Sequence, residues 1–221
     1  QINSNHYEIL MRDCRKNKNI NKTINRKLEV LKSALNLAVE LEWIQSFPKI
    51  PRLPETNYTW YIFSKEDIDN IFAETTGKYE YLRDPLYFAL HTGIRKKNIQ
   101  TLKKHHFKQT LHGMVMTIPA KQTKGGKKSG RDFVLPLTKY QEEIIKRNWH
   151  DDTDYIFKGW NGKPNLGNFR RAFTGILNRL GITQKAHDMG TKARWHDFRH
   201  TCGTQLAEMG ANSFQIKEIM G

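Results

Sequence analysis

The sequence predicts a mainly helical fold with a small antiparallel β-sheet, an α+β arrangement. Three observations support this prediction. Apolar residues recur at three- and four-residue steps in several stretches, which is the period of an amphipathic helix. Two short apolar runs flank a basic loop that contains glycine, a pattern typical of a β-hairpin. At 221 residues, the chain is long enough for one large core, or for one large domain and part of another.

The first elements are two helices. Residues 6–15 are expected to end one helix, and Lys16-Asn17-Lys18-Asn19 to form a turn. Residues 23–43 then predict a longer amphipathic helix, with Thr23 as its N-cap, from apolar positions at helical spacing: Ile24, Leu28, Leu31, Leu35, Ala38 and Leu41. Two helices bury little apolar surface by themselves. We therefore predict that residues 1–48 are part of a small helical domain.

Three prolines interrupt the helical pattern at Pro48, Pro51 and Pro54. Each lacks a backbone donor and biases the preceding residue toward extended conformations. The sequence therefore predicts a linker over residues 49–58 and a second domain over residues 59–221.

The second domain should begin with helices. Ser64-Lys65-Glu66-Asp67 resembles a capping box, and a helix should span residues 83–91 with Pro85 in its first turn. Gly93 should break that helix, and Arg95 should open another short one. These signals predict a sharp turn in the chain immediately before Arg95.

A hairpin and four helices complete the prediction. Residues 114–119 and 132–137 are the strand candidates on either side of the basic loop. Helices are expected at 138–148, where Thr138 and Gln141 fit a capping box, and at 168–180, closed by Gly181. The last two should run from about residue 196 to 209 and from 212 to 220. Tyr140 and Tyr155 are expected to be ordinary packing residues.

The charge balance points to a polyanionic partner. Lys and Arg number 37 against 22 Asp and Glu, so the formal net charge is +15. The excess runs through every segment, which suits a protein lying along a nucleic acid backbone. The absence of a long apolar run and a mean hydropathy of −0.72 disfavour a membrane protein. Cys14 and Cys202 are too few for a disulfide framework or a zinc ribbon, which favours a reducing cytosol.

His196, Arg199 and His200 are spaced to form one cationic helix face. They fall at i, i+3 and i+4, so a guanidinium lies between two imidazoles. Arginine offers a planar fork of permanent donors, and histidine can donate a hydrogen bond or exchange a proton near neutrality. Such a face can bind and transform a phosphate, although packing or capping roles would also account for two of these side chains.

Three motifs occur in order along the second domain. They are LHTGIR at residues 90–95, IPAKQTK at 118–124 with LPL at 135–137, and HDFRHT at 196–201. This ordered set resembles the tyrosine recombinases of the phage integrase family. The resemblance implies a tyrosine-recombinase catalytic domain, preceded at residues 1–48 by part of the family's helical core-DNA-binding domain.

The resemblance also implies a set of site residues. By its motifs the catalytic side chains would be Arg95, Lys124, His196 and Arg199, with His200 in a supporting role and Trp195 packed beside the site. The flanking residues favour Lys124 over Lys121 at the family's lysine position, and Lys127 and Lys128 remain alternatives. Asn98 stands where the family more often has an acidic residue that orients the first arginine. The loop residues expected to contact DNA are Lys121, Lys127, Lys128 and Arg131.

In the implied reaction, a tyrosine hydroxyl attacks the scissile phosphodiester and forms a 3′-phosphotyrosine with a free 5′-hydroxyl. The arginines would stabilise the pentavalent transition state, Lys124 would protonate the leaving oxygen, and His196 would assist proton transfer. The cationic side chains take the role of metal ions, so no metal or other cofactor is expected.

The expected partner is double-stranded DNA, with a homotetramer on DNA and a monomer without it. All eight tyrosines lie at or before Tyr155, and the chain begins at Gln1. We therefore expect a fragment cropped at both ends, lacking the nucleophile, that binds DNA but does not cleave it alone. The expected location is the cytoplasm of a bacterial or phage-infected cell, in association with the nucleoid.

Two alternative functions fit part of the sequence. His196 and His200 have the spacing of a zinc-binding helix, but the intervening acid is the short Asp197 and Arg199 would place positive charge beside the ion. A zinc hydrolase is therefore disfavoured. A non-catalytic DNA-binding regulatory protein is the other alternative, distinguished by whether a tyrosine is encoded after Gly221.

Overall fold

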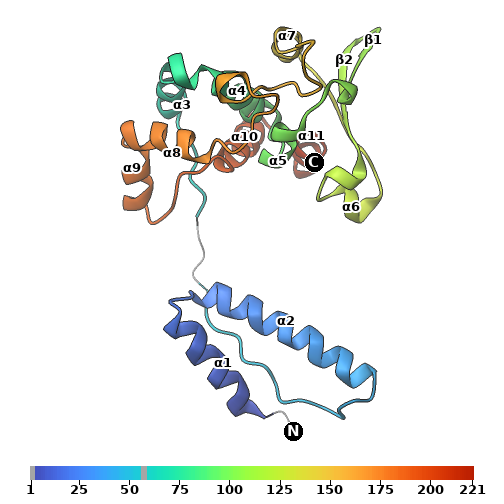
Figure 1. Cartoon of the computed structure of the whole chain (residues 1–221), viewed down its shortest axis with the longest axis vertical. Coiled ribbons are helices and arrows are strands. Elements are labelled where there is room, and N and C mark those ends of the chain that lie inside the picture. The colour runs from blue at the N-terminus through green and yellow to red at the C-terminus, as the bar shows by residue number, and fades with distance from the viewer. Residues whose placement is uncertain (1–2, 56–58) are drawn as a thin grey trace. The chain divides into compact units, whose positions relative to one another are not determined.

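The computed structural model describes residues 3–55 and 59–221. The chain divides into two units, Gln1–Tyr58 and Thr59–Gly221. Figure 1 traces both units.

The first unit contains the helices α1 (Ser4–Lys16) and α2 (Asn21–Glu40). Cys14, Ile24 and Leu28 form a small core between them. The predicted helix pair and the turn between them are present, but α2 begins at Asn21 and Thr23 is not its cap. The Asn21 side chain instead donates to the carbonyl of Pro54 at 2.8 Å. A tertiary contact therefore holds this helix end, which a local capping rule does not predict.

The segment after α2 folds back onto the pair of helices. Tyr7 donates its hydroxyl to the carbonyl of Pro48 at 3.0 Å. The Asn25 side chain donates to the carbonyl of Leu53 and accepts from its amide, both at 2.9 Å. Residues 49–55, which the prolines suggested were linker, are therefore packed against this unit. The remaining predicted linker residues, 56–58, lie outside the described residues.

The second unit is mostly helical, as predicted. Its first helices are α3 (Lys65–Ala73), α4 (Arg83–Thr92) and α5 (Lys96–Thr101). After the sheet come α7 (Lys139–Arg147), α8 (Arg170–Arg179), α9 (Ile182–Asp188), α10 (Asp197–Glu208) and α11 (Ser213–Met220). Short 3-10 turns occur at Gly77–Leu82, Lys104–His106, Ala120–Gln122 and Trp160–Gly162. The capping boxes at Ser64 and Thr138 form as predicted.

The sheet has three antiparallel strands in the order β1 (Phe107–Thr110), β2 (Gly113–Ile118) and β3 (Phe133–Pro136). Burial alternates along β2, so Met114, Met116 and Ile118 face the core. The predicted hairpin of β2 and β3 is present. The loop between them carries a one-turn helix, α6 (Gly126–Ser129), that the basic sequence did not suggest.

Helices α4 and α10 pack against each other at the centre of the second unit, and α11 packs on α10. In Figure 1 the sheet and α6 lie on one side of this centre and α3, α8 and α9 on the other. Gly93 ends α4 in a left-handed conformation, with φ of 60°. A Cβ there would lie 2.8 Å from Met220 Cγ and 3.2 Å from Cys202 Sγ. Glycine at this position therefore permits both the turn and the close approach of α10 and α11.

We expect Gly93→Ala to lower the free energy of unfolding by more than about 2 kcal/mol, because it combines left-handed backbone strain with a steric clash. Gly190→Ala is the matched control, since Gly190 has φ of 68° and open space around its Cα. It should cost about 1 kcal/mol. Urea unfolding of both variants measures the difference. Equal losses would show that Met220 and Cys202 move aside freely.

Candidate functional site

The turn after α4 places Arg95. Thr92 donates its hydroxyl to the carbonyl of Phe88 at 2.5 Å, Gly93 reverses the chain, and Ile94 is buried. Arg95 follows as the N-cap residue of α5. Its Nη1 donates to the carbonyl oxygen of Gly221 at 2.9 Å. The arginine is therefore directed at the end of α11.

Arg199, on α10, reaches the same oxygen. Its Nη2 donates to the Gly221 carbonyl at 2.8 Å, and its Nη1 donates to the carbonyls of Gly93 at 2.6 Å and Met220 at 2.5 Å. Burial, with the nearby positive charge of Arg95, lowers the pKa of Arg199 to about 10. The guanidinium stays charged at neutral pH. Two arginines separated by about a hundred residues thus converge on one acceptor atom.

The two histidines lie beside this pair. His196 is the N-cap residue of α10, and its ring meets that of His200 edge to face, with centroids 5.1 Å apart. Partial burial and the charges of Arg199 and Arg95 lower the pKa of His196. The pKa of His200 is lowered by burial, His196 and Arg199. Both imidazoles are therefore held in the neutral form that can accept a proton.

The basic loop approaches the same point. A Cβ built on Gly125 would lie 3.9 Å from the carbonyl carbon of Gly221, so the residue after Lys124 lies next to the oxygen bound by both arginines. Gly126 packs tightly on Thr123 and Ala120, which shapes the loop at this point. The lysines of the loop and its final arginine are exposed: Lys121, Lys124, Lys127, Lys128 and Arg131.

Hydrogen bonds and aromatic packing fix the position of α10. The amide of Phe63 donates to the Thr201 hydroxyl at 3.0 Å, and that hydroxyl donates to the carbonyl of Asp197 at 2.8 Å. Trp195 is buried, with its ring 4.3 Å from Phe169 between centroids. Trp195 thus packs in the core beside the site, as the sequence predicted. These contacts fix the helix that carries the cationic face.

Several groups that contact the site residues were not predicted from the sequence. Trp60 stacks on His200 with ring centroids 4.0 Å apart and an interplanar angle of 14°. The Gly93, Met220 and Gly221 carbonyls serve as acceptors for Arg199. A lone tryptophan far from the motifs and a backbone oxygen carry no sequence signal. Asn98, which stands where the family more often has an acidic residue, is buried on α5, and the described contacts include none between its side chain and that of Arg95.

The described residues offer little support for a zinc site. Within residues 3–55 and 59–221, no three His, Cys, Asp or Glu side chains are grouped to hold a metal ion. His196 and His200 therefore lack a third ligand there. No helix in the same ranges is long and apolar enough to cross a membrane.

Comparison with known proteins identifies the family of this chain. The profile of the phage integrase family matches residues 62–221, most of the chain. The chain belongs to the phage integrase family. This confirms the resemblance that the three motifs suggested, and no observation favours the regulatory or zinc alternatives.

Two curated relatives show the extent of the similarity. The chain is 22% identical over 218 residues to transposase B from transposon Tn554 of Staphylococcus aureus, covering 90% of this chain and 32% of that protein. It is 24% identical over 218 residues to tyrosine recombinase XerC of Lactobacillus leichmannii, covering 90% of this chain and 68% of that protein. The chain thus spans about a third of the length of the Tn554 relative.

Solved structures share the fold. A lambda integrase tetramer bound to a Holliday junction superposes with a TM-score of 0.73 at 12% identity, covering 100% of this chain and 64% of that one. The Tn1549 transposon integrase in complex with circular intermediate DNA gives 0.69 at 18% identity, covering 97% and 75%. At these identities the likeness establishes the fold, which confirms the predicted fold class.

The buried carboxyl of Asp197 makes the free energy of unfolding depend on pH. This carboxyl is 4% exposed and accepts from the Arg194 amide at 2.6 Å, and burial raises its pKa to about 6. The folded state therefore binds the proton more tightly than the unfolded state, so this group's contribution to stability falls as pH rises from about 4 to 6. An asparagine keeps the acceptor oxygen and cannot ionise.

We expect Asp197→Asn to gain stability relative to wild type by on the order of 1–3 kcal/mol between pH 4 and pH 7. Denaturant unfolding at several pH values measures this. Asp152→Asn is the control with the opposite sign, because Lys158 lowers the pKa of the exposed Asp152. A difference between wild type and Asp197→Asn that does not change with pH would contradict the assignment.

Proposed function

We propose that the chain is part of a site-specific DNA recombinase that cleaves and rejoins DNA through a 3′-phosphotyrosine intermediate. The observation that carries the proposal is the convergence of Arg95 and Arg199 on one oxygen, with His196 and the Lys124 loop beside it. Membership of the phage integrase family supports the same reaction. The proposed substrate is double-stranded DNA, in keeping with the net charge of +15.

The arginines would bind the scissile phosphate. Each guanidinium has five N–H donors, more than the recorded contacts to backbone carbonyls use. Phosphate oxygens are charged acceptors that form stronger hydrogen bonds than a carbonyl. In this role Arg95 and Arg199 would take the non-bridging oxygens and stabilise the charge that develops in the pentavalent transition state.

The proton transfers belong to the other side chains. Lys124 would protonate the leaving 5′ oxygen, and the neutral imidazole of His196 would take the proton of the attacking hydroxyl. His200 would support His196. The nucleophile would be a tyrosine, because the family chemistry is covalent. The eight tyrosines of this sequence all precede α10. This scheme assigns no step to a metal or other cofactor.

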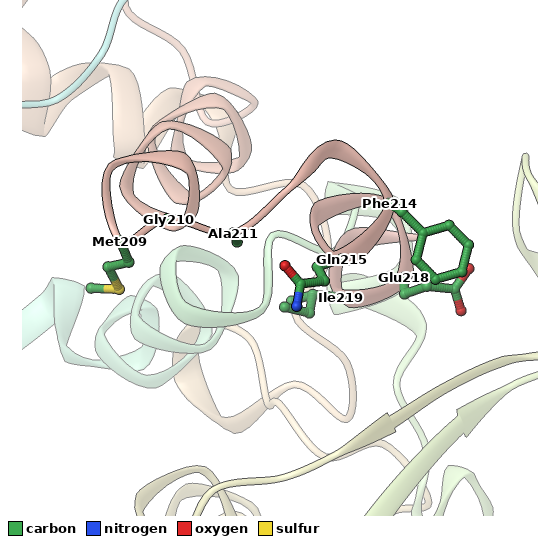
Figure 2. A pocket seen from close by; sticks show the side chains of 7 residues that line it. All are labelled: Met209, Gly210, Ala211, Phe214, Gln215, Glu218 and Ile219. Carbon is green, nitrogen blue, oxygen red and sulfur yellow. The ribbon is translucent and has the colours of Figure 1, made fainter.

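We propose that the protein is monomeric alone and forms a homotetramer on DNA. The lambda integrase structure is a tetramer on a Holliday junction, and this chain shares its fold. An apolar groove of about 480 Å³ between the ends of α10 and α11 would receive a second copy of the protein. Figure 2 shows Met209 at one end of the groove and Phe214 at the other. These side chains are 82% and 69% exposed, as expected of a surface that another protomer covers.

We further propose that the loop residues Lys121, Lys127, Lys128 and Arg131 bind the DNA backbone. All are exposed and surround Lys124 in the sequence. Contacts to phosphates position a protein without reading sequence. The protein would act in the cytoplasm of a bacterial or phage-infected cell, in association with the nucleoid.

Arg199→Ala in the full-length protein tests the reaction. We expect cleavage of a recombination site to fall by about 10²-fold or more, because the transition state loses fixed charged donors. Affinity for DNA at constant salt should change by less than about tenfold, because many other cations supply it. Arg199→Lys is the matched control that keeps the charge without the planar fork, and it should restore only a small part of the activity.

Cleavage is measured with a suicide substrate that traps the covalent adduct, and a melting curve verifies folding. Equal loss of cleavage and of DNA affinity in Arg199→Ala would indicate a simple binding surface instead of a catalytic site.

Phe214→Asp tests the assembly. We expect the tetramer on DNA to weaken by more than about tenfold, because large aromatic side chains dominate the energetics of interfaces. Binding of one protomer to one half-site should not change. Met189→Asp, at another exposed apolar residue outside the groove, is the matched control. Native gel shifts distinguish the species, and an undiminished tetramer in Phe214→Asp would exclude this groove as the contact.

A further inference from the structure

One face of the Trp60 ring contacts the site, at His200. Its ring lies parallel to that of His200, with centroids 4.0 Å apart and an interplanar angle of 14°. The tryptophan is 59% exposed and is not among the residues that form the core of its unit. Its main packing contact is therefore with a histidine of the cationic helix face, and not with the hydrophobic core.

The residues after Trp60 fix its position relative to α10. Tyr61 is buried and donates its hydroxyl to Asp67 at 2.8 Å. The Phe63 amide donates to Thr201 on α10 at 3.0 Å, and its ring stacks on Phe198 with centroids 4.7 Å apart. The segment of residues 60–63 is thus anchored twice within three residues of Trp60. Because its neighbours fix the position of the Trp60 ring, that ring can restrict the motion of the His200 ring stacked on it.

His200 depends on such a contact. Its Nε2 is buried and has no hydrogen-bond partner among the described residues. Buried histidines are normally oriented by hydrogen bonds to their ring nitrogens. Here one face of the ring lies on Trp60, and the ring meets His196 edge to face with centroids 5.1 Å apart. Aromatic contacts therefore set the orientation of His200, and His200 borders His196.

We propose that Trp60 is a positioning residue: through its stack on His200, it orients the imidazole of His196 for proton transfer. The proposal rests on the proposed recombinase function, in which His196 assists the attacking hydroxyl. Trp60 itself touches no reacting atom. Its role is to keep the second histidine from rotating, so that His196 has one orientation beside Arg199.

The same contact sets the electrostatic environment of the histidines. The pKa of His200 is lowered first by burial, and Trp60 covers one of its faces. Arg199 acts on both imidazoles, Arg95 acts on that of His196, and His196 acts on that of His200. Removal of the tryptophan should therefore change histidine titration without altering any charge in the site.

Histidine titration by NMR tests the positioning directly in the protein of residues 1–221. In Trp60→Ala, we expect the pKa of His200 to rise toward its ordinary value and the cross-peaks between His196 and His200 to weaken. Trp60→Phe should retain wild-type behaviour, because a flat ring remains. Trp60→Leu keeps apolar bulk without a flat ring, so it should behave like Trp60→Ala and provides a second variant should the alanine protein fail to fold.

Trp160→Ala is the matched control, because Trp160 is 47% exposed in the same unit and packs on Tyr81 away from the site. It should leave both titrations unchanged. Unchanged His196 and His200 titrations in Trp60→Ala and Trp60→Leu would overturn the proposal.

Cleavage by the full-length protein tests the catalytic consequence. We expect Trp60→Ala to lower the cleavage rate about tenfold and to shift its pH profile, with DNA affinity unchanged and with rescue by Trp60→Phe. Suppose that wild type cleaves and Arg199→Ala does not. If Trp60→Ala then cleaves with the pH profile of wild type, the positioning role of Trp60 is excluded, and the proposed function stands. If wild type cleaves no site although Trp60→Ala shifts the titrations, the proposed function fails, and with it the catalytic role of Trp60.

Discussion

The hydrogen bonds of Arg199 are the constraint on which the site depends. The guanidinium is partly buried, and a charge withdrawn from water is stabilised by hydrogen bonds from its donors. Carbonyls from the end of α4 and from the end of α11 provide the acceptors. The turn at Gly93 must therefore present its carbonyl inward, and α11 must pack close to α10. One side chain thus connects three elements that are distant in sequence.

Arg95 adds a second positive charge to the same place, and this arrangement is unfavourable until an anion arrives. Within residues 3–55 and 59–221, no ion pair involves either arginine. The nearby acid, Asp197, has its pKa raised to about 6 by burial and is directed at the Arg194 amide. In the proposed function a phosphodiester would balance the two charges, because it has both the charge and the acceptor oxygens to do so.

Sequence patterns predicted the elements whose signals are local. The capping boxes at Ser64 and Thr138 and the glycine stop at Gly93 were confirmed because each is defined by a few neighbouring side chains. Strand β1 was missed because Phe-Lys-Gln-Thr is mostly polar, and pairing with β2 stabilises it through the backbone. Helix α9 was missed for a related reason, since only Ile182 and Ala186 are buried. The packing of residues 49–55 depends on Asn25, which no local rule identifies.

In the site, too, a motif identifies side chains, whereas the contacts between them arise from the tertiary fold. Arg95, His196 and Arg199 could be named from their motifs. The carbonyls that the arginines bind and the stack of Trp60 on His200 could not, because both depend on tertiary packing.

DNA affinity and the proposed catalysis depend on different kinds of cationic side chain. Exposed cations spread along the chain attract any polyanion, and their loss one at a time changes little. In the proposed reaction the half-buried pair of arginines would contribute differently, because donors fixed in a partly dry site stabilise developing charge far better than mobile surface lysines can. In the proposed function, DNA affinity and catalysis would therefore depend on different residues of the same basic protein.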